Sequence, residues 1–78
     1  MTAIASILMT DRAQEIAAAV RARRSELGLR QQELAELAGC STRFVHTVEA
    51  GKTTVRLDKL TDVLEVLGLR LVVTGPSR

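Results

Sequence analysis

The chain of 78 residues contains a single cysteine, Cys40, and a single histidine, His46. One cysteine cannot form an internal disulfide, and no cysteine–histidine spacing matches a zinc site. A catalytic Cys40–His46 pair would need a third group to orient the base, and the sequence offers none. We therefore expect no enzymatic activity and no metal or cofactor, with Cys40 as a small apolar filler and His46 on the surface.

Long apolar segments are also missing. The opening residues 2–9 are apolar, but no basic stretch precedes them, and the segment is too brief for a signal peptide. Nothing approaches the roughly 20 apolar residues of a membrane-spanning helix. The sequence therefore predicts a cytoplasmic protein without membrane contact, in which Cys40 stays reduced.

Positive charge is unevenly distributed, although the formal net charge is only +2. The first two thirds of the chain hold most of the lysines and arginines: Arg12, Arg21, Arg23, Arg24, Arg30, Arg43 and Lys52. Such residues would suit a phosphate backbone beside a protruding helix, and they equally suit an ordinary solvated face. Charge alone leaves both interpretations open.

A chain of this length forms one domain with a small core and a marginally stable fold. Disulfides and structural metals stabilise many small domains, but this sequence supports neither. We therefore expect a second copy of the chain to supply the missing stability.

The first helix is predicted to begin at Asp11, whose side chain can cap it together with Gln14. It should end at Gly28, because glycine tolerates the left-handed conformation that terminates helices. Its apolar face consists of Ile16, Val20 and Leu27. Residues 1–10 are expected to form a loose arm or an extra helical turn.

Two short helices should follow, over residues 31–38 and 42–50, with a corner at residues 39–41 between them. Ser41 is the expected cap of the second, because its oxygen can accept a free backbone N–H. The expected core-facing residues are Leu34, Ala35, Leu37 and Ala38 on the first helix, and Val45, Val48 and part of Phe44 on the second.

A fourth helix is predicted after a turn at residues 51–54, and it should end at Gly68. The prediction rests on the clearest 3.6-residue apolar stripe in the chain. The stripe consists of Leu57, Leu60, Val63, Leu64 and Leu67. Residues 11–68 would thus form the helical domain.

Residues 69–74 are rich in β-branched side chains and lie before Gly75-Pro76, which predicts one strand. The strand consists of Leu69, Arg70, Leu71, Val72, Val73 and Thr74, and residues 75–78 form a tail. Because a lone strand has no partner in this chain, we predict a two-stranded antiparallel ribbon between two copies. The alternatives are a frayed tail or pairing with the arm near residues 4–8.

Residue types at many spaced positions within residues 16–67 resemble the phage-repressor (Xre, Cro- and cI-like) family of helix-turn-helix proteins. The matching positions are Arg21, Arg24, residues 28–31, 33–35, Gly39 and 48–52. The resemblance implies a mainly α, lambda-repressor-like helix-turn-helix domain of four to five helices, here with one C-terminal β-strand that pairs across a dimer. The second helix of the motif would read the major groove of DNA.

Residues 52–57 and 67–73 resemble more narrowly the HipB-type antitoxins, which add a strand after the last helix and dimerise through it. Members of that group repress their own operon and bind a HipA-like serine/threonine kinase toxin. The resemblance implies a homodimer, a double-stranded DNA operator and such a kinase as partners of this chain.

The resemblance also implies roles for single residues. Thr42, Arg43, His46 and Thr47 match the base-contacting positions of the reading helix. Arg43 is the strongest candidate, because a guanidinium can bind guanine O6 and N7 together. Its alternative role is a phosphate contact.

Phosphate contacts are expected at Gln31, Arg30, Ser41, Arg21, Arg23 and Lys52. Gln31 matches the phosphate-binding glutamine of the family, where the side-chain amide and the helix dipole can meet the same phosphate. Arg30 stands where the family usually has a small capping residue, so we expect a lost cap and a gained attraction to phosphate. Arg24 and Glu49 match a structural ion pair.

The sequence therefore predicts a dimeric repressor that inserts two reading helices into successive major grooves, about 34–36 Å apart, on an inverted repeat. Its predicted role is the antitoxin of a HipBA-like operon. A stand-alone phage-type repressor, or a module that sequesters a kinase without binding DNA, are the alternatives.

Overall fold

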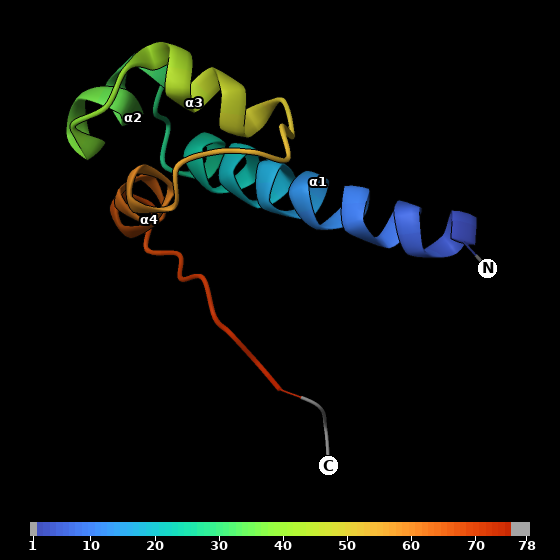
Figure 1. The fold of residues 1–78 in the computed structure, drawn as a ribbon. Coiled ribbons are helices and arrows are strands. Elements are labelled where there is room, and N and C mark those ends of the chain that lie inside the picture. The colour runs from blue at the N-terminus through green and yellow to red at the C-terminus, as the bar shows by residue number, and fades with distance from the viewer. Residues whose placement is uncertain (1, 76–78) are drawn as a thin grey trace.

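The computed structural model describes residues 2–75. Four helices occur there: α1 (Thr2–Glu26), α2 (Gln31–Ala38), α3 (Thr42–Glu49) and α4 (Leu57–Val66). The three shorter helices gather around the C-terminal half of α1, and its N-terminal half projects beyond them (Figure 1). After α4 the chain runs away from the helices as an extended segment (Figure 1).

Helix α1 is much longer than the sequence predicted. It begins at Thr2, so Asp11 lies inside the helix and the segment expected as an arm or extra turn is helical. No glycine or proline interrupts residues 2–26, and alanine, the best helix former, recurs throughout them. The predicted end is confirmed, since Gly28 has a φ of 69° and the Leu29 N–H donates to the Arg24 carbonyl at 3.0 Å.

Gln14 was expected to share a cap with Asp11, but its amide instead lies against Gly51, just after α3. A side chain at Gly51 would collide with this amide, and Gly51 also has a φ of 79°. The positive φ favours glycine there, whereas the flexible Gln14 side chain could move aside. The Gln14 side chain thus lies where α1 passes the end of α3.

All four helices contribute to the core. Its largest fully buried side chains are Leu34, Leu67, Val20, Val45 and Val63. Ala35 is 2% exposed, and this small side chain lets α2 pack closely against its neighbours. The sequence predicted these residues correctly, but it missed Ala17, which is fully buried on α1.

Three leucines predicted to face the core are exposed: Leu27 by 44%, Leu37 by 63% and Leu57 by 61%. Leu27 follows the last residue of α1 and Leu57 is the first of α4, so both lie at helix ends, at the edge of the hydrophobic core. Leu37 lies on the opposite side of Leu34 from Ala35, because successive residues turn by about 100° around a helix. The buried face of α2 is therefore narrower than expected.

Residues 69–75 form no hydrogen-bonded strand within the described part of the chain. Pairing with residues 4–8 is wrong, because that segment is helical and offers no strand edge. The ribbon between two copies stays a prediction, since its hydrogen bonds would need a second chain. No helix in residues 2–75 has the length and apolar character needed to cross a bilayer.

Replacing Leu34 by alanine should lower the free energy of unfolding by about 2–5 kcal/mol, because a fully buried leucine would leave a cavity. Leu37→Ala, on the same helix, should change it by less than about 0.5 kcal/mol. Urea unfolding measures both. Equal losses would show that α2 packs through the wider face that the sequence suggested.

Candidate nucleic-acid interface

Helix α3 is fixed at its start by Ser41. The Ser41 Oγ accepts a hydrogen bond from the Phe44 N–H at 3.0 Å, which confirms the predicted cap. The hydroxyl lies at the corner between α2 and α3, where it is exposed. The cap therefore sets where α3 begins and how its first turn is presented.

The two sides of α3 differ in burial. Val45, Val48 and Glu49 are buried against the other helices. On the other side, Thr42, Arg43 and His46 are exposed and Thr47 is half-buried. The four base-contact candidates thus lie together on the outward part of one helix.

The Thr47 hydroxyl is already used within α3, because its Oγ1 donates to the Arg43 carbonyl at 2.9 Å. Its single proton is therefore unavailable to a base or a phosphate. Thr47 can still accept a hydrogen bond at Oγ1, and its methyl group suits the methyl of thymine.

Arg30 precedes α2, and its side chain makes no capping hydrogen bond. The cap is not wholly lost, because Glu33 reaches back and accepts the Arg30 backbone N–H at 2.8 Å. This backbone bond, with a second from the Arg30 side chain, lowers the pKa of Glu33. The Arg30 side chain is 79% exposed, so it can still reach a phosphate.

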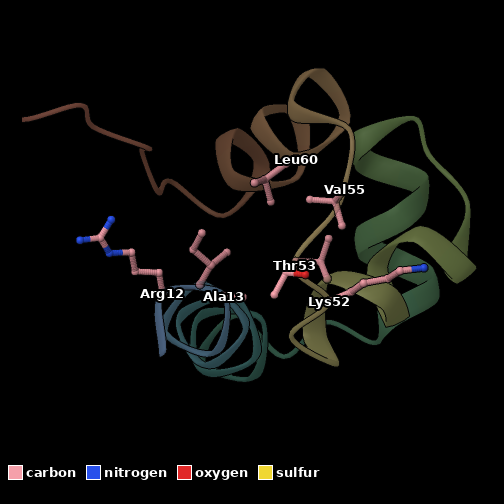
Figure 2. Close-up of a pocket in the computed structure, with 8 residues that line it drawn as sticks. Arg12, Ala13, Lys52, Thr53, Val55 and Leu60 are labelled. Carbon is pink, nitrogen blue, oxygen red and sulfur yellow. The ribbon is translucent and has the colours of Figure 1, made fainter. Parts of the chain in front are cut away.

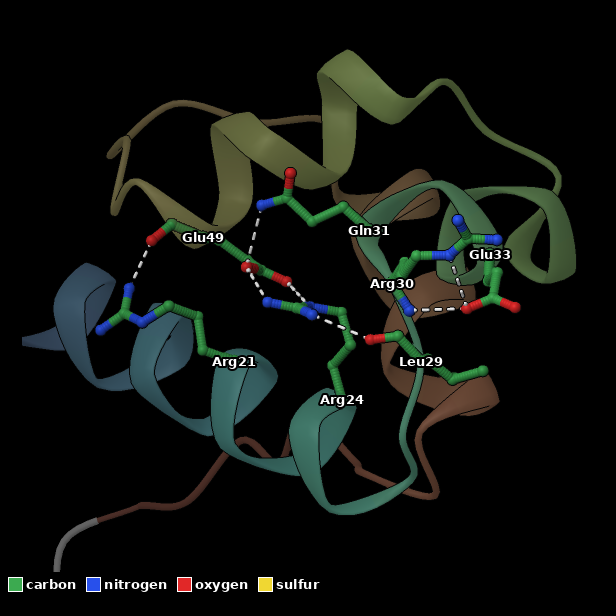
Figure 3. A network of polar contacts seen from close by, with 7 residues as sticks. All are labelled: Arg21, Arg24, Leu29, Arg30, Gln31, Glu33 and Glu49. Atoms are coloured by element: carbon green, nitrogen blue, oxygen red, sulfur yellow. Dashed lines mark hydrogen bonds and ion pairs between the residues drawn. The ribbon is translucent and has the colours of Figure 1, made fainter.

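A buried carboxylate, Glu49, joins three helices (Figure 3). Arg24 on α1 donates to it twice, from Nε at 2.6 Å and from Nη2 at 3.0 Å. Gln31 on α2 donates its amide Nε2 to the same carboxylate at 3.0 Å. The predicted Arg24–Glu49 pair is therefore present, with Gln31 as an additional donor.

Burial by itself would raise the pKa of Glu49. The hydrogen bonds from Arg24 and Gln31, together with the positive charges of Arg24 and Arg21, outweigh burial and lower the pKa below its ordinary value of 4.5. Glu49 is therefore ionised at neutral pH. The network can hold the end of α3 against α1 and the start of α2.

Three residues predicted to touch phosphate have structural contacts. Gln31 binds Glu49, Arg21 donates to the Glu49 backbone carbonyl, and Arg23 Nε donates to the Leu67 carbonyl at 2.8 Å. Their remaining N–H groups, and the free backbone N–H groups at the start of α2, could still meet a phosphate. Their contact with DNA stays a prediction.

Lys52 is exposed and follows Gly51 in the turn after α3. Figure 2 shows this side chain pointing away from Arg12, which lies on the far side of the groove between α1 and α4. Its ammonium group is therefore free to extend beside the end of α3.

The sequence did not reveal which contact supports the corner between α2 and α3. Lys59 on α4 donates to the Gly39 carbonyl at 3.4 Å, and Cys40 beside it is half-buried. Burial raises the pKa of the Cys40 thiol, which agrees with the expected role of a small apolar filler. The Lys59 contact joins residues 20 positions apart, so local pattern could not reveal it.

Residues 15–73 match the family of helix-turn-helix domains. The chain belongs to this family. It is also 44% identical over 63 residues to the HTH-type transcriptional regulator y4mF of Sinorhizobium fredii (strain NBRC 101917 / NGR234), a match that covers 81% of this chain and 83% of the relative. In this helix-turn-helix domain, α2 and α3 form the motif, and α3 is the second helix.

The Glu49→Gln variant should lower the free energy of unfolding by about 3–5 kcal/mol at pH 7, because Arg24 would keep a partly buried charge without a carboxylate partner. The folded pKa of Glu49 is lowered, so its stabilising effect is full above the unfolded pKa and is lost as the pH falls through the folded one.

Urea unfolding at several pH values tests this contribution. The difference between the wild type and Glu49→Gln should shrink as the pH drops below about 4. Glu36→Gln is the matched control, because Glu36 is exposed on α2. A difference that stayed constant down to pH 2 would contradict an ionised, stabilising Glu49.

Proposed function

We propose that this chain is a sequence-specific DNA-binding transcriptional repressor that inserts α3 into the major groove. The observation that carries the proposal is the division of α3 into a buried side held by Glu49 and an outward side with Thr42, Arg43 and His46. A helix of this kind fits a groove about 12 Å wide. The family and the similarity to a transcriptional regulator support it.

Arg43 is the proposed principal reader of sequence. It is exposed, and its guanidinium makes no hydrogen bond or ion pair with residues 12–75, whose side chains the structure describes. All its donors are thus available for the two acceptors of guanine. His46 and Thr42 would contact neighbouring bases or phosphates.

Arg30 and Lys52 are the proposed phosphate contacts whose side chains hold no distant part of the domain, since the one side-chain partner of Arg30 in the described chain is the nearby Glu33. Arg30 lies at the start of α2 and Lys52 just after α3, so together they flank the motif. The exposed Ser41 hydroxyl and the N-terminus of α2 add donors between them. Such contacts fix the orientation of a reading helix without selecting a sequence.

The repressor is proposed to act as a homodimer joined through residues 69–74. Two copies would place two α3 helices on an inverted repeat, with half-sites about 34–36 Å apart. The support is the extended conformation and exposure of this segment, together with its β-branched composition. The protein would act in the cytoplasm.

Its proposed biological role is the antitoxin of a HipBA-like operon, with a HipA-like serine/threonine kinase as toxin. The support is the similarity of residues 52–57 and 67–73 to HipB-type antitoxins. Co-expression with a kinase-like protein encoded beside it, followed by co-purification, tests this role. Without such a neighbouring gene, a stand-alone repressor is favoured.

Fluorescence anisotropy with a labelled duplex from upstream of the gene tests DNA binding itself. Affinity should fall steeply with salt, with a slope of log affinity against log salt of roughly −0.9 for each phosphate contact. A scrambled duplex of equal length is the control for sequence preference. Binding that is absent or insensitive to salt would favour a module that only sequesters a partner.

Arg43→Ala should weaken binding to the operator about 5- to 150-fold, because a guanidinium pair on guanine contributes roughly 1–3 kcal/mol of discrimination. Binding to the scrambled duplex should change much less. Arg56→Ala is a matched control, because Arg56 is exposed but its guanidinium pairs with Asp58 at 2.7 Å. An equal loss on both duplexes would make Arg43 a phosphate contact.

Arg30→Ser should raise stability by about 1 kcal/mol, because serine at this position can cap α2. It should also reduce the magnitude of the salt slope by roughly 0.9 through loss of one phosphate contact. Urea unfolding and anisotropy measure the two effects. Raised stability with unchanged operator affinity would refute the phosphate role of Arg30.

A further inference from the structure

The extended segment after α4 lies between two hollows. One, of about 260 Å³, separates it from α1 and is lined by Glu15, Ile16, Ala19, Leu64 and residues 69–72. The other, of about 490 Å³, lies toward α4 and is lined by Thr61, Leu64, Glu65, Gly68 and residues 69–71. Both sides of the segment therefore have open hollows that side chains of another chain could enter.

The segment exposes consecutive apolar side chains. Leu71 is 42% exposed, Val72 is 64% exposed and Val73 is 96% exposed. Single exposed apolar residues are common on protein surfaces, but a contiguous group of them marks a surface that binds something. A six-residue ribbon alone is too small for a stable dimer, which buries about 1,200–2,000 Å². A second contact area is needed.

Opposite charges line the hollow beside α1. Glu15 projects from α1 and Arg70 from the extended segment, and both are exposed. Neither forms an ion pair with any other part of the described chain. The lining of the hollow thus combines the apolar residues Ile16 and Ala19 with one acidic and one basic side chain, each without an ion-pair partner in the described chain.

Antiparallel pairing of two such segments has a simple register. If the ribbon is centred on Leu71, then Val72 of one copy lies directly opposite Arg70 of the other. Residues that lie opposite each other project from the same face of a ribbon. Because Val72 lines the hollow with Glu15, the Arg70 side chain of the second copy would enter that same hollow.

We propose that the hollow between α1 and residues 69–72 receives the Arg70 side chain from the corresponding segment of a second copy, beside Glu15. Helix α1 then becomes part of the dimer interface, in addition to the ribbon. This inference rests on the dimeric repressor proposed above, and it names the surface by which the dimer is held. The occupant is a second copy because it carries both the matching charge and the unpartnered apolar residues.

Charge reversal tests the contact between copies. Glu15→Arg and Arg70→Glu should each raise the dimer dissociation constant at least roughly tenfold, because each dimer contains the altered contact twice. Sedimentation velocity on the full chain measures this constant. Glu36→Arg is the matched control, since Glu36 is exposed on α2 and lines neither hollow. Circular dichroism should show all three variants folded.

Mixing the two weakened variants separates contact between copies from contact within one. In a mixed dimer, the arginine introduced by Glu15→Arg would face the glutamate introduced by Arg70→Glu, and the second contact would keep its original Glu15 and Arg70. Both contacts would then be attractive, so the mixed dimer should regain the wild-type constant. Contacts within each chain would stay repulsive. A mixture that remains as monomeric as its components, or single variants that dimerise like Glu36→Arg, would overturn the proposal.

The outcome is independent of DNA binding. Arg43→Ala should leave the dimer constant unchanged while it weakens operator binding. Charge-sensitive dimerisation without operator binding would support the interface and refute the repressor. If the dimer binds the operator and neither charge reversal changes its dissociation constant, this interface alone is refuted. A monomeric wild type would refute both the interface and the ribbon.

Discussion

The carboxylate of Glu49 is the contact on which the rest of this small domain depends. It lies at the end of α3 and binds Arg24 from α1 and Gln31 from α2, so one buried charge holds three helices. A buried carboxylate without such partners would strongly destabilise the fold. The three helices must therefore stay in the arrangement that keeps Arg24 and Gln31 in contact with Glu49. The orientation of α3 relative to α2, and hence of its outward side chains, follows from this network.

The internal contacts of the arginines explain why net charge says little about function here. Arg21, Arg23 and Arg24 bind carbonyl or carboxylate groups of the domain itself, whereas the side chains of Arg43 and Lys52 make no hydrogen bond or ion pair with the described residues. Arginine suits the first role because its planar donors can bind several acceptors at once. Arg43 and Lys52 therefore keep all their side-chain donors for another molecule, whereas Arg21 and Arg23 keep only those that their internal contacts leave over.

Small size shapes the remaining surface. The four helices enclose a core of few large side chains, and α1 extends well beyond it, starting before the family match at residue 15. At the other end, residues 69–75 leave apolar side chains uncovered. A second copy that covers this segment would supply both stability and the second reading helix that an inverted repeat needs.

The sequence alone determined both ends of α2, the ends of α3 and α4 to within one or a few residues, the Ser41 cap and most of the core, because caps, glycine stops and apolar periodicity are local. The Arg24–Glu49 pair was also predicted, from a family resemblance. The sequence did not reveal the length of α1, the exposure of Leu37, the Gln14 contact with Gly51 or the carbonyl partners of Arg21 and Arg23. Those partners lie 28 and 44 positions away. Only tertiary packing decides which distant carbonyl a long side chain can reach, and so which arginines remain free.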